Sequence, residues 1–121
     1  GLPPAMNILI VDDSGEAREA LAHMLDGFGA DVVCLPSGAA ALDRVRAARE
    51  RGRPVDLVLM DWAMPGMDGI ETSHRLAAIG EPVPKIILVT AHGRHWTEDQ
   101  LRRAGIVAAL FRVVQSAAYR R

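Results

Sequence analysis

Three aspartates that directly follow apolar runs are the residues of this chain best suited to chemistry. Asp12 and Asp13 follow the run 8–11, and Asp61 follows the run 55–60. If these runs are neighbouring strands of a parallel sheet, the three carboxylates converge at one sheet edge, where their mutual repulsion is severe without a bound cation. Carboxylate oxygens are ligands that Mg²⁺ prefers. The pattern therefore predicts a magnesium site that leaves one carboxylate oxygen to react.

The elements that must position these acids alternate between strand-sized apolar runs and helical patterns. Runs that are continuously rather than alternately apolar over most of their length predict strands covered on both faces, as in a parallel sheet between two layers of helices. The five predicted strands are 8–11, 32–35, 55–60, 86–89 and 106–111. With right-handed crossovers, this alternation predicts a doubly wound α/β sandwich. Thr90 then lies at the carboxyl end of the fourth strand, where ligands bind in such sheets.

Four helices are expected between the strands. Ser37 is placed to cap a second helix that runs towards Arg51, and a third helix follows Gly69. Thr97 and Gln100 have the spacing of a capping box at the start of the fourth. The first helix is predicted from apolar residues that share one helical face: Ala17, Leu21, Met24, Leu25 and Phe28.

Length and composition are those of one ordinary globular domain. The chain has 121 residues, of which 50% are hydrophobic and 24% charged. Its net charge of −1 gives no reason to expect contact with nucleic acid or with an anionic membrane. Cys34 is the only cysteine, and no signal peptide or membrane-length apolar run is present, so we expect a cytoplasmic setting. Residues 1–5 are expected to be a linker or a cloning remnant.

The order of these motifs resembles the receiver domain of bacterial two-component response regulators and hybrid histidine kinases. The resemblance covers residues 6–113 and rests on three motifs in sequence: Asp12-Asp13, Asp61-Trp62-Ala63-Met64-Pro65-Gly66-Met67-Asp68-Gly69 and Thr90-Ala91. Taken singly, a strand-end aspartate can instead cap a turn or helix, and Thr90 can be an ordinary strand residue. The family implies a flavodoxin-like five-stranded sheet of order 2-1-3-4-5 with helices on both faces.

The resemblance also implies how the acids would work. Asp12 and Asp13 would contact Mg²⁺ directly or through water, while Asp61 and the backbone carbonyl of Ala63 would contact it directly. Asp61 would then attack phosphorus in line and take the phosphoryl group from a phosphohistidine. The implied partner is a histidine kinase or a histidine phosphotransfer domain. The domain would catalyse only its own phosphorylation and dephosphorylation.

The implied switch lies at the end of the fourth strand. The Thr90 hydroxyl and the Ala91 N–H would donate hydrogen bonds to the phosphoryl oxygens. Binding of the phosphoryl oxygens by these two groups would draw the loop from Ala91 to Trp96 towards the site and remodel the nearby surface. Trp62 is expected beside the site and partly exposed.

The chain departs from the family after the fifth strand. Where receivers usually carry Lys-Pro, this sequence has Arg112-Val113. Lys85 is the only lysine, and it lies roughly 16 Å before Thr90 along the fourth strand, so it cannot substitute. Arg112 could bind the phosphoryl group bidentately or point outward as an ordinary surface arginine, and the sequence leaves both open.

Two further departures concern the carboxyl-terminal part of the chain. Ala109 stands where many receivers have a Tyr or Phe that moves with the threonine. Residues 114–121 predict a fifth helix that is short or altered, and its incomplete cover could favour a homodimer. Because no effector domain follows, we expect this chain to be one domain of a hybrid kinase or multidomain regulator.

Competing functions remain to be weighed against a phosphoacceptor. A degenerate receiver, acting as a phosphorylation-independent interaction module, is favoured by Ala109 and Arg112-Val113 but opposed by the intact acids and Thr90. An aspartate-nucleophile phosphatase needs a second acid two residues after the nucleophile, where this chain has Ala63. A flavin-binding protein is disfavoured because the loop 12–18 is acidic rather than a glycine-rich phosphate cradle.

Overall fold

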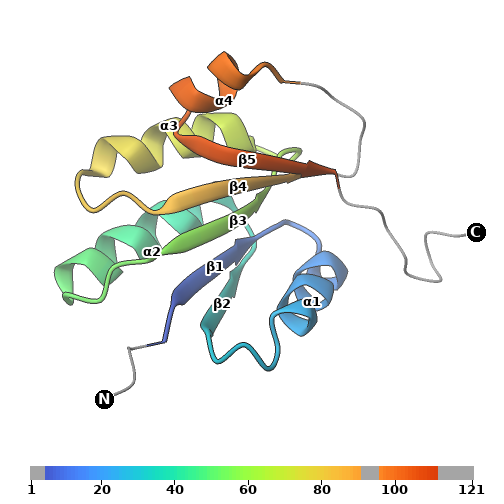
Figure 1. The fold of residues 1–121 in the computed structure, drawn as a ribbon, viewed down its shortest axis with the longest axis vertical. Helices are drawn as coiled ribbons and strands as arrows, with labels where there is room; N and C mark the ends of the chain where they lie inside the picture. Colours follow the sequence, from blue (N-terminus) through green and yellow to red (C-terminus); the bar gives the residue numbers. More distant parts are fainter. Residues whose placement is uncertain (1–4, 91–95, 112–121) are drawn as a thin grey trace, which may run out of the picture.

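The computed structural model of the chain describes residues 5–90 and 96–111, and its five parallel strands form one sheet (Figure 1). The strand order is β2-β1-β3-β4-β5, which confirms the flavodoxin-like arrangement. The strands are β1 (Asn7–Val11), β2 (Asp31–Leu35), β3 (Leu57–Asp61), β4 (Lys85–Thr90) and β5 (Ile106–Phe111). The described helices are α1 (Gly15–Met24), α2 (Gly38–Glu50), α3 (Gly69–Ile79) and α4 (Glu98–Arg103).

The helices begin at the polar residues that the sequence indicates. The Ser37 hydroxyl accepts a hydrogen bond from the Ala40 N–H at 3.1 Å, so the predicted cap of α2 is confirmed. At α4, Thr97 and Gln100 form the predicted capping box, with reciprocal bonds of 2.9 and 3.0 Å. At α3, the Asp68 carboxylate accepts a hydrogen bond from the Glu71 N–H at 2.8 Å. These caps satisfy N–H groups that have no partner inside a helix.

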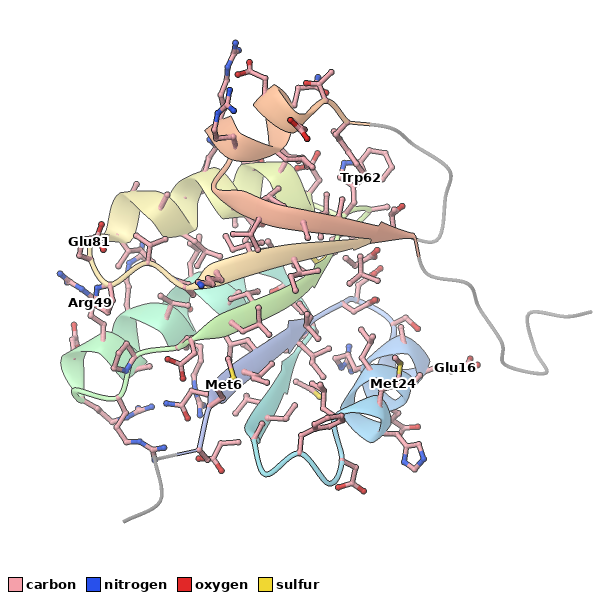
Figure 2. The ribbon with its side chains drawn as sticks, in the orientation of Figure 1. Met6, Glu16, Met24, Arg49, Trp62 and Glu81 are labelled. Atoms are coloured by element: carbon pink, nitrogen blue, oxygen red, sulfur yellow. The ribbon has the colours of Figure 1, made fainter. Side chains whose placement is uncertain are left out.

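The first helix is shorter than its apolar pattern suggested. α1 ends at Met24 (Figure 2), which is 69% exposed. Phe28 lies beyond the helix and is 78% exposed. Phe28 therefore does not belong to the predicted helical face, and Met24, although it lies in the helix, is exposed. Gly27 has a φ of 90°, which a right-handed helix cannot contain, so the chain turns before Phe28 can reach the sheet. Within α1, only Ala17 and Leu21 are buried.

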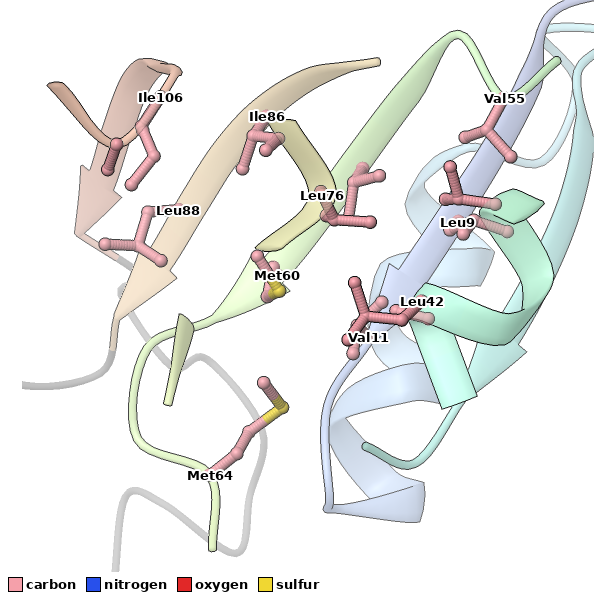
Figure 3. Close-up of a cluster of buried hydrophobic side chains, with 14 of the residues drawn as sticks. Leu9, Val11, Leu42, Val55, Met60, Met64, Leu76, Ile86, Leu88 and Ile106 are labelled. Carbon is pink, nitrogen blue, oxygen red and sulfur yellow. The ribbon is translucent and has the colours of Figure 1, made fainter. Parts of the chain in front are cut away.

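The main hydrophobic core lies between the sheet and helices α2 and α3 (Figure 3). Because side chains alternate along a strand, Leu9 and Val11 face this core while Ile8 and Ile10 face α1. Leu42 and Leu76 bring α2 and α3 onto it. Apolar packing on both faces therefore fixes the strands, and their carboxyl ends can build a site.

Candidate acidic site

Strand pairing brings the three aspartates to one place. β1 and β3 are neighbours with Val11 opposite Met60, so the residues that follow them reach the same edge of the sheet. One carboxylate oxygen from each of Asp12, Asp13 and Asp61 lies within 4.8 Å of the other two. Asp12 is only 2% exposed, Asp61 is half-buried and Asp13 is exposed. The predicted convergence is confirmed, and the cluster runs from the interior to solvent.

Asp12 is held by backbone groups from two neighbouring elements. Its N–H donates to the Leu35 carbonyl at the end of β2 at 3.1 Å, and its Oδ1 accepts from the Ser14 N–H at 2.9 Å. The Arg18 guanidinium, on the first turns of α1, donates to the Asp12 carbonyl at 2.8 Å. Arg18 thereby ties the first turns of α1 to the end of β1. No motif in the sequence singled out Arg18.

Asp61 is fixed by the backbone that surrounds it. It is the last residue of β3, opposite Val89 of β4. The next residue, Trp62, donates its N–H to the Val89 carbonyl at 3.1 Å, and its own carbonyl accepts from the Gly69 N–H at 2.9 Å. The loop after β3 is thus tied both to β4 and to the start of α3. An oxygen that must react in a fixed direction benefits from this restraint.

Gly69 leaves no room for a side chain beside Asp61. A Cβ at this position would lie 2.6 Å from Leu88 Cδ1 and 2.8 Å from the Asp61 carbonyl oxygen. The helix expected after Gly69 is confirmed as α3, and Asp68 caps it. The close packing of Gly69 was not foreseen, because it depends on how α3 meets β3 and β4.

Thr90 reaches the same edge of the sheet as the acids. It is the last residue of β4, the strand next to β3, and it is 4% exposed. Lys85 is the first residue of that strand and is exposed, so the prediction that it lies far from Thr90 is confirmed.

Comparison with known proteins identifies the family. Residues 8–118 match the family model of the response regulator receiver domain. The chain belongs to this family. Receiver domains are signalling domains of two-component systems, and some of them form part of hybrid histidine kinases.

Two relatives show the kinds of protein in which sequences similar to this receiver domain occur. It is 35% identical over 112 residues to the cyclic di-GMP phosphodiesterase response regulator RpfG of Xanthomonas campestris, covering 91% of this chain and 29% of that protein. It is 32% identical over 107 residues to the sensor histidine kinase GacS of Pseudomonas protegens, covering 84% of this chain and 11% of that protein. The chain therefore spans less than a third of either relative.

A solved structure shares both fold and sequence. The receiver domain of the histidine kinase CKI1 from Arabidopsis thaliana, complexed with Mg²⁺, matches with a TM-score of 0.74 and 27% identity. The match covers 94% of this chain and 88% of that one. The fold expected from the sequence is thus found in a known receiver.

Some residues expected to take part in the receiver site lie outside the described part of the chain. They are Ala91 and Arg112; Val113 and the C-terminal segment 114–121 also lie outside it. Ala63 is described, and it is exposed in the loop that follows Asp61. No described helix has both the length and the apolar content needed to cross a lipid bilayer.

Two tryptophans pack beside the acidic site. Trp62, which directly follows Asp61, is half-buried, as predicted. Its ring meets Trp96 edge to face, with ring centroids 5.6 Å apart and an interplanar angle of 70°. Trp96 directly precedes Thr97, the cap of α4. The pair links the loop after β3 to the start of α4, and nothing in the sequence pattern marked the two residues as partners.

Proposed function

We propose that this receiver domain accepts a phosphoryl group on Asp61 and uses Mg²⁺ to do so. The observation that best supports the proposal is the gathering of Asp12, Asp13 and Asp61, each with an oxygen within 4.8 Å of the others. Three converging carboxylates are the hard oxygen donors that suit Mg²⁺. Together with the Ala63 carbonyl, they would hold the ion.

The transfer requires little from the protein beyond position and charge. The phosphoryl donor is a phosphohistidine on a histidine kinase or a histidine phosphotransfer domain. An Asp61 carboxylate oxygen forms a bond to phosphorus as the phosphorus–nitrogen bond breaks, and the imidazole leaves and takes up a proton. Bound Mg²⁺ would neutralise charge on the carboxylates and on the phosphoryl oxygens. The backbone bonds of the loop after β3 would help to keep the Asp61 carboxylate in position for attack.

Thr90 and Ala91 would hold the product. The Thr90 hydroxyl donates to one phosphoryl oxygen and the Ala91 N–H to another. Thr90 suits this role because it ends the strand beside β3 and is almost fully buried, so little solvent competes with it. Arg112 is the candidate for a third, cationic contact, in place of the lysine usual in the family.

The domain passes on a signal instead of converting a separate substrate. We propose that it works in the cytoplasm as part of a longer hybrid kinase or response regulator, with an effector domain or a second copy as the responding partner. Support comes from the relatives, one named a sensor histidine kinase and one a response regulator. We do not expect this domain itself to contact nucleic acid or a membrane.

The test is phosphorylation of the purified chain with Mg²⁺ and acetyl phosphate. Intact mass should show one labile phosphoryl adduct, and beryllofluoride should change tryptophan fluorescence through Trp62. Asp61→Asn should abolish both effects, and omission of Mg²⁺ should prevent the adduct. Asp43→Asn, on the exposed side of α2, is the matched control and should behave as the parent chain.

A negative result would support the alternative reading. If neither acetyl phosphate nor a phosphorylated histidine phosphotransfer protein modifies the chain, a phosphorylation-independent interaction module becomes the better account. The sequence departures Ala109 and Val113 favour that alternative. Arg112→Lys would then test whether the arginine in place of the family's lysine prevents phosphorylation. Phosphorylation restored by Arg112→Lys would show that it does.

A further inference from the structure

The arginines of this chain are concentrated in one segment. Residues 43–53 contain five of the thirteen arginines, against the two acids Asp43 and Glu50, and so carry a net charge of +3. Because the whole chain carries −1, the remaining residues together carry −4. The segment comprises the second half of α2 and the start of the connection to β3. Residues 43–53 therefore form a local basic surface on a domain whose other residues carry a net negative charge.

This basic surface lies at the opposite end of the sheet from the acidic site. The segment precedes β3, whereas Asp61 ends it. In Figure 2, Arg49 and Met6 lie on the left side of the molecule, and Trp62 and Glu16 lie on the right. A partner bound at the basic end would therefore leave Asp61 accessible.

A groove runs along one side of the basic surface. It has a volume of about 240 Å³ and is lined by Arg44, Arg51 and Arg53, with Val33, Ala48 and Val55 among its apolar residues. We call it the arginine groove. Ligand pockets for small molecules usually measure roughly 300–1,000 Å³. The smaller size and apolar floor suit a single hydrophobic side chain better than a whole small molecule.

Two of the arginines at the groove have their guanidinium groups available. Arg53 pairs with Asp31 at 3.1 Å, and across α2 the Arg46 and Arg49 side chains contact Asp43 and the Glu81 carbonyl. Arg44 and Arg51 make no side-chain hydrogen bond or ion pair within residues 5–90 and 96–111. Guanidinium groups are suited to bidentate contacts with carboxylates.

We propose that the arginine groove is a docking surface for an acidic segment of a partner protein. One apolar side chain of that segment enters the groove, and flanking carboxylates pair with Arg44 and Arg51. Apolar anchors surrounded by charged contacts are the usual arrangement of protein interfaces. The surrounding charge of +3 would also steer an acidic partner towards this end of the domain.

Other occupants fit the groove less well. Segment 112–121 of this chain has three arginines and no acid, so it would be repelled. Nucleic-acid-binding domains are typically basic overall, and this chain has a pI of about 6.5. A second copy could offer its acidic end, but contact between two different surfaces does not close into a dimer and would cover the Asp61 site.

The test uses the ¹⁵N-labelled full chain and a synthetic peptide, Glu-Leu-Glu-Asp-Leu-Glu, with both ends blocked. Backbone amide shifts followed by NMR should concentrate at Val33, Ala48 and Val55, and the amides of Asp12 and Asp61 should not move. A peptide with glutamate in place of both leucines should bind more weakly. Added salt should weaken binding, because the flanking contacts are ionic.

Charge reversal at the groove provides the decisive comparison. Arg44→Glu with Arg51→Glu should weaken the peptide about tenfold or more, since two ion pairs become two repulsions. Arg51→Glu alone, at an exposed position, should give a smaller loss of affinity. It also provides a reading if the double variant fails to fold. Arg102→Glu with Arg103→Glu on α4 changes the net charge equally and should alter affinity less than about twofold.

Three outcomes would overturn the proposal. The first is peptide binding that is unchanged by charge reversal at the groove. The second is amide shifts at the groove residues that a short DNA duplex or inorganic phosphate produces but the peptide does not. The third is self-association of the chain through the groove without peptide binding. Asp61→Asn should leave peptide binding unchanged. Failure of the phosphoacceptor function and failure of the docking surface can therefore be told apart.

Discussion

Gly69 is the residue whose replacement should most directly disturb the acidic site. The Cβ of Gly69→Ala would press on Leu88 and on the Asp61 carbonyl, both of which are held by the sheet. We expect the free energy of unfolding to fall by about 1–3 kcal/mol, the usual cost of overpacking. Phosphorylation of Asp61 should also slow, because its backbone must shift. Urea denaturation and a phosphorylation time course measure the two effects.

Gly15 provides the control for this substitution. It is the exposed first residue of α1, and a Cβ there would meet only Arg18 Nη2 at an ordinary 3.5 Å. Gly15→Ala should therefore leave the stability unchanged or raise it by up to about 1 kcal/mol. Equal effects of the two alanine substitutions would contradict the packing argument for Gly69.

Asp13 offers a test of repulsion within the acidic cluster. It is the exposed member, so Asp13→Asn should raise the free energy of unfolding without Mg²⁺ by about 0.5 kcal/mol through relief of like charges. With Mg²⁺ present, the parent chain should gain more stability than the variant, because ligand binding stabilises the folded state in proportion to affinity. Thermal unfolding of the parent chain and of Asp13→Asn, each with Mg²⁺ and with a chelator, gives the four stabilities to compare.

Asp26, exposed in the turn after α1 and outside the cluster, is the control for charge removal. Asp26→Asn should change neither the stability without Mg²⁺ nor the Mg²⁺-dependent gain. A loss of stability in Asp13→Asn without metal would mean that the three carboxylates do not repel one another as their spacing suggests.

At the scale of elements, the Trp62–Trp96 contact joins the loop after β3 to α4. Aromatic pairs contribute about 0.5–1.5 kcal/mol beyond the area that they bury. A double-mutant cycle with Trp62→Ala and Trp96→Ala should therefore give a coupling free energy in this range. In Trp96→Ala, the beryllofluoride response of Trp62 fluorescence should be smaller. Additive single effects would show that the two rings stabilise the fold independently.

The carboxyl end of α1 shows where sequence reasoning failed at this scale. Periodicity placed Met24 and Phe28 on one helical face with Ala17 and Leu21, but spacing alone does not reveal where a helix stops. The positive φ of Gly27 turns the chain before Phe28 can pack. The caps at Ser37 and Thr97 were predicted correctly, because the signal there is local and chemical.

At the scale of the whole molecule, the fold could be predicted because every central strand is an apolar run. The convergence of Asp12, Asp13 and Asp61 followed from their places at strand ends in a parallel sheet. Arg18, Gly69 and the tryptophan pair could not be foreseen. Their roles depend on contacts between elements that only the folded chain brings together.

The charges of the molecule are separated along the sheet. Acidic side chains gather where β1 and β3 end, and arginines gather around the carboxyl end of α2. If both proposals hold, the domain can engage a phosphoryl donor at one end and an acidic partner at the other at the same time. Neither contact then needs to exclude the other.

The scarcity of lysine has a practical consequence. Lys85 carries the only ε-amine of the chain and lies exposed at the start of β4, the end of that strand remote from Thr90. Apart from the chain terminus, reagents that attack primary amines have this one target. A surface or dye coupled there would hold the domain in a single orientation and leave the acidic end facing the solution.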